Sequence, residues 1–154
     1  MYSDEIIFRE KHYYPFHRGI THVETLYLTL LDYVLRNRMS SIEFIRLFVD
    51  YAYDSVVKPE ILRDIEIKRK FIEYLKKEFK TRFSEKLGDV CPNFENGEPI
   101  EQCIKFLTIP DHLRKLYTNE EIRSGKAQQE IFRICYKILY IACMAILRDL
   151  KLIR

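Results

Sequence analysis

The residues best suited to recognition chemistry lie in the first twenty positions, where aromatic rings alternate with cations and histidines. Aromatic faces stack on nucleic-acid bases while arginine and lysine neutralise phosphates, so this combination is typical of proteins that bind single strands. We call residues 1–20 the N-terminal arm, and its candidate binding residues are Arg9, Lys11, Tyr13, Tyr14, His17 and Arg18. There are two alternatives: the rings plug the end of a helical bundle while the charged tips remain in water, or the arm docks onto another subunit.

Histidines at a regular spacing are the second feature of this region. His12, His17 and His22 recur every five residues, and Glu24 adds a fourth group that could bind a metal ion. Structural zinc sites combine such ligands with a matched second pair, which this sequence does not contain. We therefore predict no metal and no cofactor. A small helical metal-dependent nuclease or hydrolase built from these histidines is an alternative hypothesis.

Cations also follow one face of a long helix predicted over residues 59–87, where apolar residues such as Ile65 and Ile72 recur at helical spacing and form the expected buried stripe. The three that share a side of this helix, separated by seven and four residues, are Arg69, Lys76 and Lys80. They form a candidate basic ridge for an acidic partner such as a nucleic acid. The alternative is an ordinary solvated face, because acids are interleaved with the cations and Glu73 and Lys77 have the spacing of a favourable ion pair.

The four cysteines form two pairs with different expectations. Cys135 and Cys143 are eight residues apart on one predicted helix, about 12 Å by helical rise, so they cannot bridge each other and are expected to be small buried residues. Cys91 and Cys103 enclose the one clear loop, residues 88–98. They are the candidate disulfide, which would contribute about 3 kcal/mol and is of a kind found in hyperthermophiles. Two free thiols are the alternative.

Helix start signals divide the rest of the chain. The Ser/Thr-x-x-Glu pattern of a capping box begins at Thr21, Ser40 and Thr118, and Pro59 suits a first helical position. Apolar stripes at helical spacing follow these signals, and shorter helices are predicted over residues 99–108 and 110–117. The last helix contains Ile131–Leu150, the most apolar run of the chain, which needs other helices around it. The predicted fold is all-α: a single compact bundle of five to seven helices around this C-terminal helix, forming one domain over residues 1–154.

Composition and charge limit the classes of function. A chain of 154 residues with 47% hydrophobic and 32% charged residues fits one globular domain. Its net charge of +3 permits an acidic partner without requiring one. No signal peptide is visible and the uninterrupted apolar run is shorter than the ~20 residues that span a bilayer, so we predict a cytoplasmic protein that does not enter a membrane. Scarce Asn and Gln beside abundant Lys and Glu favour a hyperthermophilic archaeon or its virus, with an AT-rich mesophile or its virus as the alternative.

Motifs of the common enzyme classes are missing from the sequence. It contains no phosphate loop, Rossmann fingerprint, nucleophile elbow or HExxH. We therefore predict a non-enzymatic interaction protein, such as an archaeal or viral adaptor or a small subunit of a nucleoprotein complex. Its expected partner is a protein, and nucleic acid is a further candidate. A structural homo-oligomer, with an interface on Ile131–Leu150, is the remaining alternative.

Overall fold

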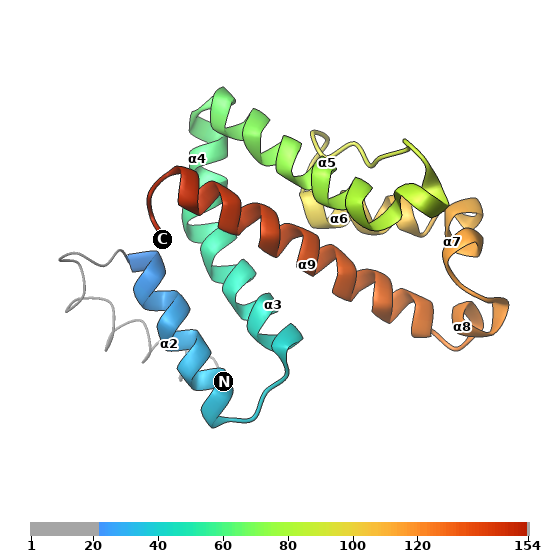
Figure 1. Cartoon of the computed structure of the whole chain (residues 1–154), viewed down its shortest axis with the longest axis horizontal. Coiled ribbons are helices and arrows are strands. Elements are labelled where there is room, and N and C mark those ends of the chain that lie inside the picture. The colour runs from blue at the N-terminus through green and yellow to red at the C-terminus, as the bar shows by residue number, and fades with distance from the viewer. Residues whose placement is uncertain (1–21, 154) are drawn as a thin grey trace.

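The computed structural model describes residues 22–153, and every regular element in this range is helical (Figure 1). The elements are α2 (His22–Arg36), α3 (Ser41–Ala52), the π-helical η1 (Tyr53–Val57), α4 (Lys58–Arg63), α5 (Ile65–Leu87), α6 (Pro99–Leu107), α7 (Pro110–Leu116), α8 (Asn119–Arg123) and α9 (Lys126–Asp149). Because α3, η1 and α4 follow one another without a break, the described residues form seven separate helices. The predicted all-α class and the predicted number of helices are confirmed.

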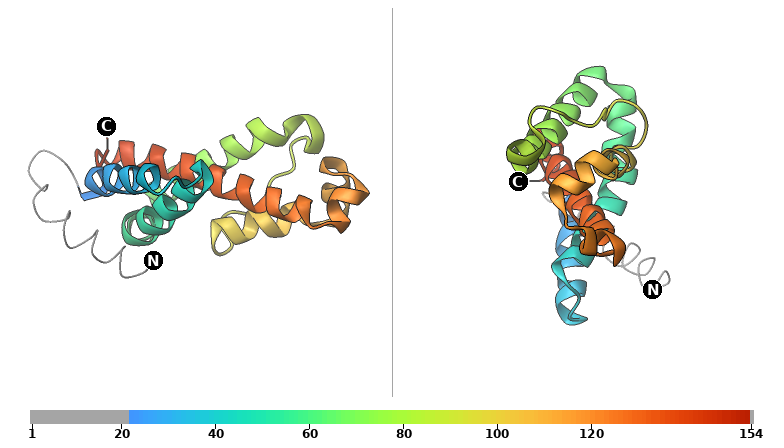
Figure 2. Two further views of the ribbon diagram at one scale, coloured as in Figure 1. Left: turned by 90° about the horizontal axis from the view of Figure 1, so that it is seen from below. Right: turned by 90° about the vertical axis from the view of Figure 1, so that its right-hand side faces the viewer.

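The C-terminal helix α9 is the centre of the bundle. It packs against α3, α5, α6, α8 and η1. The residues that it buries are Ala127, Ile131, Cys135, Ile138, Leu139, Ala142, Cys143, Ile146 and Leu147. Burying one large aliphatic side chain of this kind contributes roughly 1.5–3 kcal/mol. In Figure 2, α2 and α3 lie towards one end of α9, and α7 and α8 lie at the other. The predicted arrangement around this helix is therefore confirmed.

Local capping explains where several helices begin. Ser40 accepts a hydrogen bond from the Glu43 backbone, and the Glu43 carboxylate accepts one from the Ser40 backbone, which completes a capping box at α3. Thr118 and Glu121 form the same reciprocal pair at α8. These two boxes were predicted from the sequence and are confirmed. The third, at Thr21, lies outside the described residues.

The long helix predicted over residues 59–87 is divided in two at Asp64, so this prediction was wrong. Asp64 has extended backbone angles, and its carboxylate accepts a hydrogen bond from the Glu66 backbone N–H at 2.9 Å, which caps a new helix. The break turns α5 relative to α4, and Ile65, predicted to lie on the buried stripe, is 79% exposed. Pro59 lies in the first turn of α4, but α4 continues from α3 through η1 without a break, so Pro59 does not start a separate helix as predicted.

The segment 88–98 connects α5 to α6 and is anchored at both ends. Gly88 ends α5 with a φ of +67°, a backbone conformation that glycine adopts without steric cost. Further along, Phe94 is buried and packs edge-on against Phe79 of α5. At the far end, the Glu98 carboxylate accepts hydrogen bonds from the Tyr53 hydroxyl at 3.1 Å and from Lys58 Nζ at 2.9 Å. The segment therefore contacts α5 through Phe94, and η1 and α4 through Glu98.

Candidate partner-binding groove on α5

A groove lies between the first half of α5 and Glu95 of the segment 88–98. Its volume is about 360 Å³, and its lining consists of Ile65, Lys68, Arg69, Ile72, Glu73, Lys76 and Glu95. We call it the α5 groove. It holds two members of the predicted basic ridge, Arg69 and Lys76. The third, Lys80, lies one helical turn beyond Lys76 on the same helix.

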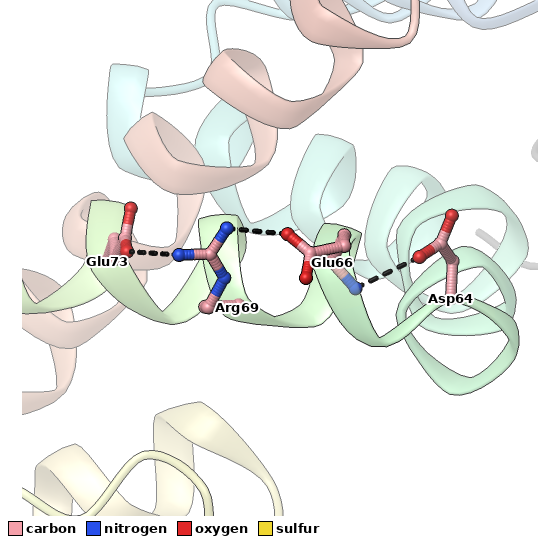
Figure 3. Close-up of polar contacts among 4 residues, drawn as sticks. All are labelled: Asp64, Glu66, Arg69 and Glu73. Carbon is pink, nitrogen blue, oxygen red and sulfur yellow. Dashed lines mark hydrogen bonds and ion pairs between the residues drawn. The ribbon is translucent and has the colours of Figure 1, made fainter.

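Arg69 is held by carboxylates on its own helix. Its guanidinium lies 2.5 Å from the Glu66 carboxylate and 3.7 Å from that of Glu73. Figure 3 shows Arg69 between these two glutamates. The hydrogen bond with Glu66 is the first cause of the raised pKa of Arg69. Glu73 therefore pairs with Arg69, four residues before it, and not with Lys77, so the ion pair predicted from their spacing is not formed. Arg69 adds little net positive charge to the groove.

Lys68, Lys76 and Lys80 are the cations of this face that are free for a partner. Within residues 22–153 none of the three makes an ion pair, and all three are exposed. The whole of α5 has eight cations against four acids, a formal charge of +4, whereas the entire chain has +3. The rest of the chain therefore has a net charge of −1, and the net positive charge of the chain comes from this one helix.

Aliphatic side chains lie beside these cations. Ile72 is 7% exposed and forms the floor of the groove, while Ile65 is exposed at its mouth. Leu62, at the end of α4, is 76% exposed but does not line the groove. Ile72 is buried, as its place in the apolar stripe predicted, whereas Ile65 is not. No pattern in the sequence indicated that Lys68 or Glu95 belongs to a site. The capping potential of Asp64 was the one signal that could have shown Ile65 to be exposed.

The predicted disulfide between Cys91 and Cys103 is not present in the structure, which has both residues as free thiols. Cys103 is buried on α6, and a hydrogen bond with the Cys135 side chain of α9, together with burial, raises its pKa. Because α6 directs Cys103 into the core, its sulfur partner is Cys135 and not Cys91. Burial also raises the pKa of the half-buried Cys91, against an opposing effect of Lys76 and Lys80. Cys143 is buried as predicted.

A second surface cluster joins α3 to α9. The Arg46 guanidinium lies over the rings of Phe132 and Tyr136, at 5.3 Å and 5.5 Å from their centroids. The Tyr136 hydroxyl donates a hydrogen bond to Asp50 at 3.3 Å. The cation–π contacts and the hydrogen bond join α3 to α9, and we interpret the cluster as a structural contact between the two helices.

The remaining predicted site residues lie in the N-terminal arm, outside the described residues, so their roles stay predictions. From residue 22 to residue 153 no three His, Cys, Asp or Glu side chains are grouped to hold a metal ion. In the same range no helix, α9 included, has the length and hydropathy needed to cross a lipid bilayer. No family model matches the chain, and no curated protein or solved structure shows significant similarity to it. The functional proposal therefore rests on the geometry of α5.

Proposed function

We propose that this chain is a non-enzymatic binding protein that holds an acidic partner along the exposed face of α5, as an adaptor or a small subunit of a larger assembly. The observation that carries this proposal is the set of unpaired cations, Lys68, Lys76 and Lys80, on a helix of formal charge +4. Cations without an intramolecular partner attract the carboxylates or phosphates of another molecule without first breaking an internal ion pair.

The apolar side chains beside these cations support the same function. Binding interfaces combine an apolar centre, which excludes water, with a charged and polar rim that fixes the orientation of the partner. On α5, Ile72 forms such a centre and the lysines form the rim. The exposed Ile65 extends the apolar surface at the mouth of the groove.

Retention on immobilised heparin, a polyanion, measures whether the basic face of α5 binds acidic groups. We expect the variant Lys76→Glu/Lys80→Glu to elute at clearly lower salt than the wild type, because surface charge pairs are screened by salt. The matched control is Lys105→Glu/Lys115→Glu, which changes two exposed lysines of α6 and α7 and alters the net charge equally. We expect this control to elute later than the α5 variant. Equal elution of the two variants, or no retention of the wild type at low salt, would contradict the proposal.

The N-terminal arm is proposed as a second contact on the basis of its sequence. Rings and cations in this arm would stack on bases and neutralise phosphates of a single strand. A gel shift with single-stranded RNA at increasing salt tests this contact, with Tyr13, Tyr14 and Arg18 changed to alanine. We expect the shift to be lost in this variant. A shift of the same size in the variant and the wild type would remove the arm from the proposal.

A further inference from the structure

We propose that the α5 groove binds an extended acidic segment of a partner protein, in which two carboxylates flank one aliphatic side chain. This inference rests on the proposed function and specifies the chemistry of the partner. It is based on the order Lys68, Ile72, Lys76 along α5, and on the carboxylates of Glu73 and Glu95 in the groove lining.

The spacing of the groove residues matches the repeat of an extended peptide. Lys68, Ile72 and Lys76 follow one another at four-residue intervals on α5, and all three line the groove. Four residues of α-helix rise about 6 Å. Two residues of an extended strand rise about 6.6 Å, and alternate side chains of a strand point to the same side. A segment of the pattern acid-x-aliphatic-x-acid therefore places one carboxylate on each lysine and its central side chain on Ile72.

Apolar surface gives the central side chain a binding site. Ile72 forms the floor, and the aliphatic stems of the two flanking lysines widen it. Ile65 stands 79% exposed at the mouth and contacts the end of a bound segment. Ile72 is already buried, so the apolar surface that a leucine or isoleucine removes from water is mainly that of Ile65 and of the lysine stems, and its burial favours binding. A general basic surface attracts acids without such an apolar contact. A requirement for an aliphatic residue at the centre of the peptide therefore distinguishes this groove from a general basic surface.

The acids of the groove argue against a nucleic-acid strand as the occupant. Glu73, which pairs with Arg69, and Glu95 both line the groove, and a continuous chain of phosphates would lie against the Glu95 carboxylate. None of the seven lining residues is aromatic, whereas binding of single strands relies on rings that stack on the bases. In a peptide of the proposed pattern the acids are placed only where the lysines are. Glu95 then disfavours an additional acid next to the central residue.

The volume of the groove also fits a short peptide segment. About 360 Å³ is at the small end of the range for ligand sites in proteins, which start near 300 Å³. Such a space accepts a few side chains of an extended segment. It does not accept a helix of 10–12 Å diameter. The occupant is therefore a linear segment and not a folded helix laid along α5.

Fluorescence anisotropy with two labelled peptides of identical composition tests the inference. The first contains Glu-Ser-Leu-Ser-Glu, and the second contains the same residues in the order Glu-Glu-Leu-Ser-Ser. We expect the first to bind wild-type protein about tenfold more tightly, because only its carboxylates reach both lysines. Equal affinity for the two peptides would overturn the inference while leaving the proposed basic face in place. Failure of both peptides together with failure of heparin retention would overturn the proposed function as well.

Variants of the protein separate the aliphatic contact from the charge contacts. We call the first peptide, Glu-Ser-Leu-Ser-Glu, the spaced peptide. Ile65→Ser is expected to weaken its binding severalfold. Leu62→Ser changes an equally exposed aliphatic side chain outside the groove and is expected to leave the affinity unchanged. Lys76→Glu is expected to weaken binding by about tenfold or more. A peptide in which one glutamate is replaced by lysine should then recover affinity for this variant. The end of the peptide that gives recovery identifies its direction along α5.

A single-stranded RNA of similar length is the competitor that tests the other class of partner. We expect it not to displace the spaced peptide from wild-type protein when RNA and peptide are present at equal concentration. Displacement of the peptide from wild-type protein by this RNA would show that the groove belongs to a nucleic-acid site, and the peptide proposal would then be abandoned. Effects of Ile65→Ser and Leu62→Ser of the same size would also refute it.

Discussion

Tyr53→Phe tests the anchor that holds the segment 88–98 against the bundle. The substitution removes the hydroxyl that donates to Glu98 at 3.1 Å but keeps the ring that packs on Phe71. Glu98 keeps its ion pair with Lys58, so no buried carboxylate is left without a partner. A hydrogen bond to a charged acceptor contributes about 1.5–3 kcal/mol when buried, and partial exposure of Glu98 reduces this to about 1 kcal/mol. For a chain of this size such a loss lowers Tm by roughly 2–4 °C.

Alkaline pH gives the same substitution a second signature. Burial, followed by the neighbouring Glu98 carboxylate, raises the pKa of Tyr53 above its ordinary value of 10.0. Tyr53 in the unfolded chain therefore ionises first, and its contribution to stability is complete below pH ~10 and lost as the pH rises above that value. The loss is at most about 1.4 kcal/mol per pH unit for one group. Tyr53→Phe should lose less stability than the wild type over this alkaline range.

Urea unfolding followed by circular dichroism, at neutral pH and in steps to pH ~11.5, measures both effects. Tyr74→Phe is the matched control, because its hydroxyl also bonds to a carboxylate, that of Asp149, but at an exposed position. We expect a smaller change for this control, since exposed polar contacts are screened by water. Two results would refute the proposed role of the anchor. One is a Tyr53→Phe variant as stable as the wild type at neutral pH. The other is a free energy of unfolding that falls equally steeply with alkaline pH in Tyr53→Phe and in the wild type.

Three further predictions concern the cysteines, the core and the division of the long helix. Ellman's reagent should titrate Cys91 alone in the folded protein, because the other three cysteines are at most 2% exposed. In denaturant it should titrate four thiols, and two thiols would instead show a disulfide. Leu147→Ala should lower the free energy of unfolding in urea by about 2–5 kcal/mol because Leu147 is fully buried, whereas Leu35→Ala, at an exposed position, should change it by no more than about 0.5 kcal/mol. Asp64→Ala should cost about 1 kcal/mol through loss of the cap of α5, and an unchanged urea midpoint would argue against that cap.

The parts of the fold that depend on residues close in sequence could be predicted. The capping boxes at Ser40 and Thr118 involve residues three apart, and the apolar run of α9 identified the central helix without any tertiary information. The division at Asp64 was missed because the apolar spacing continues across it with little change. A single aspartate that caps a new helix outweighed that spacing, and it moved Ile65 from the predicted core to the surface.

The candidate groove could not be predicted because its opposite wall comes from a distant segment. The hydrogen bond that anchors this wall, from Tyr53 to Glu98, joins residues 45 positions apart. The contact between Cys103 and Cys135 likewise depends on how α6 meets α9. The sequence did indicate the cations of α5. It could not show that Arg69 is neutralised while Lys76 is free, because those pairings depend on which rotamers the neighbouring carboxylates adopt.

The concentration of charge on α5 has a consequence for the speed of binding. Since this helix has a formal charge of +4 and the whole chain only +3, the attraction of the protein to an acidic surface comes mainly from α5. In the field of an acidic surface such a molecule rotates during its approach, so that α5 arrives first. Oriented approach of this kind raises association rate constants above the usual 10⁵–10⁶ M⁻¹s⁻¹ and makes them fall with ionic strength. A salt-dependent association rate with a nearly constant dissociation rate would be its kinetic signature.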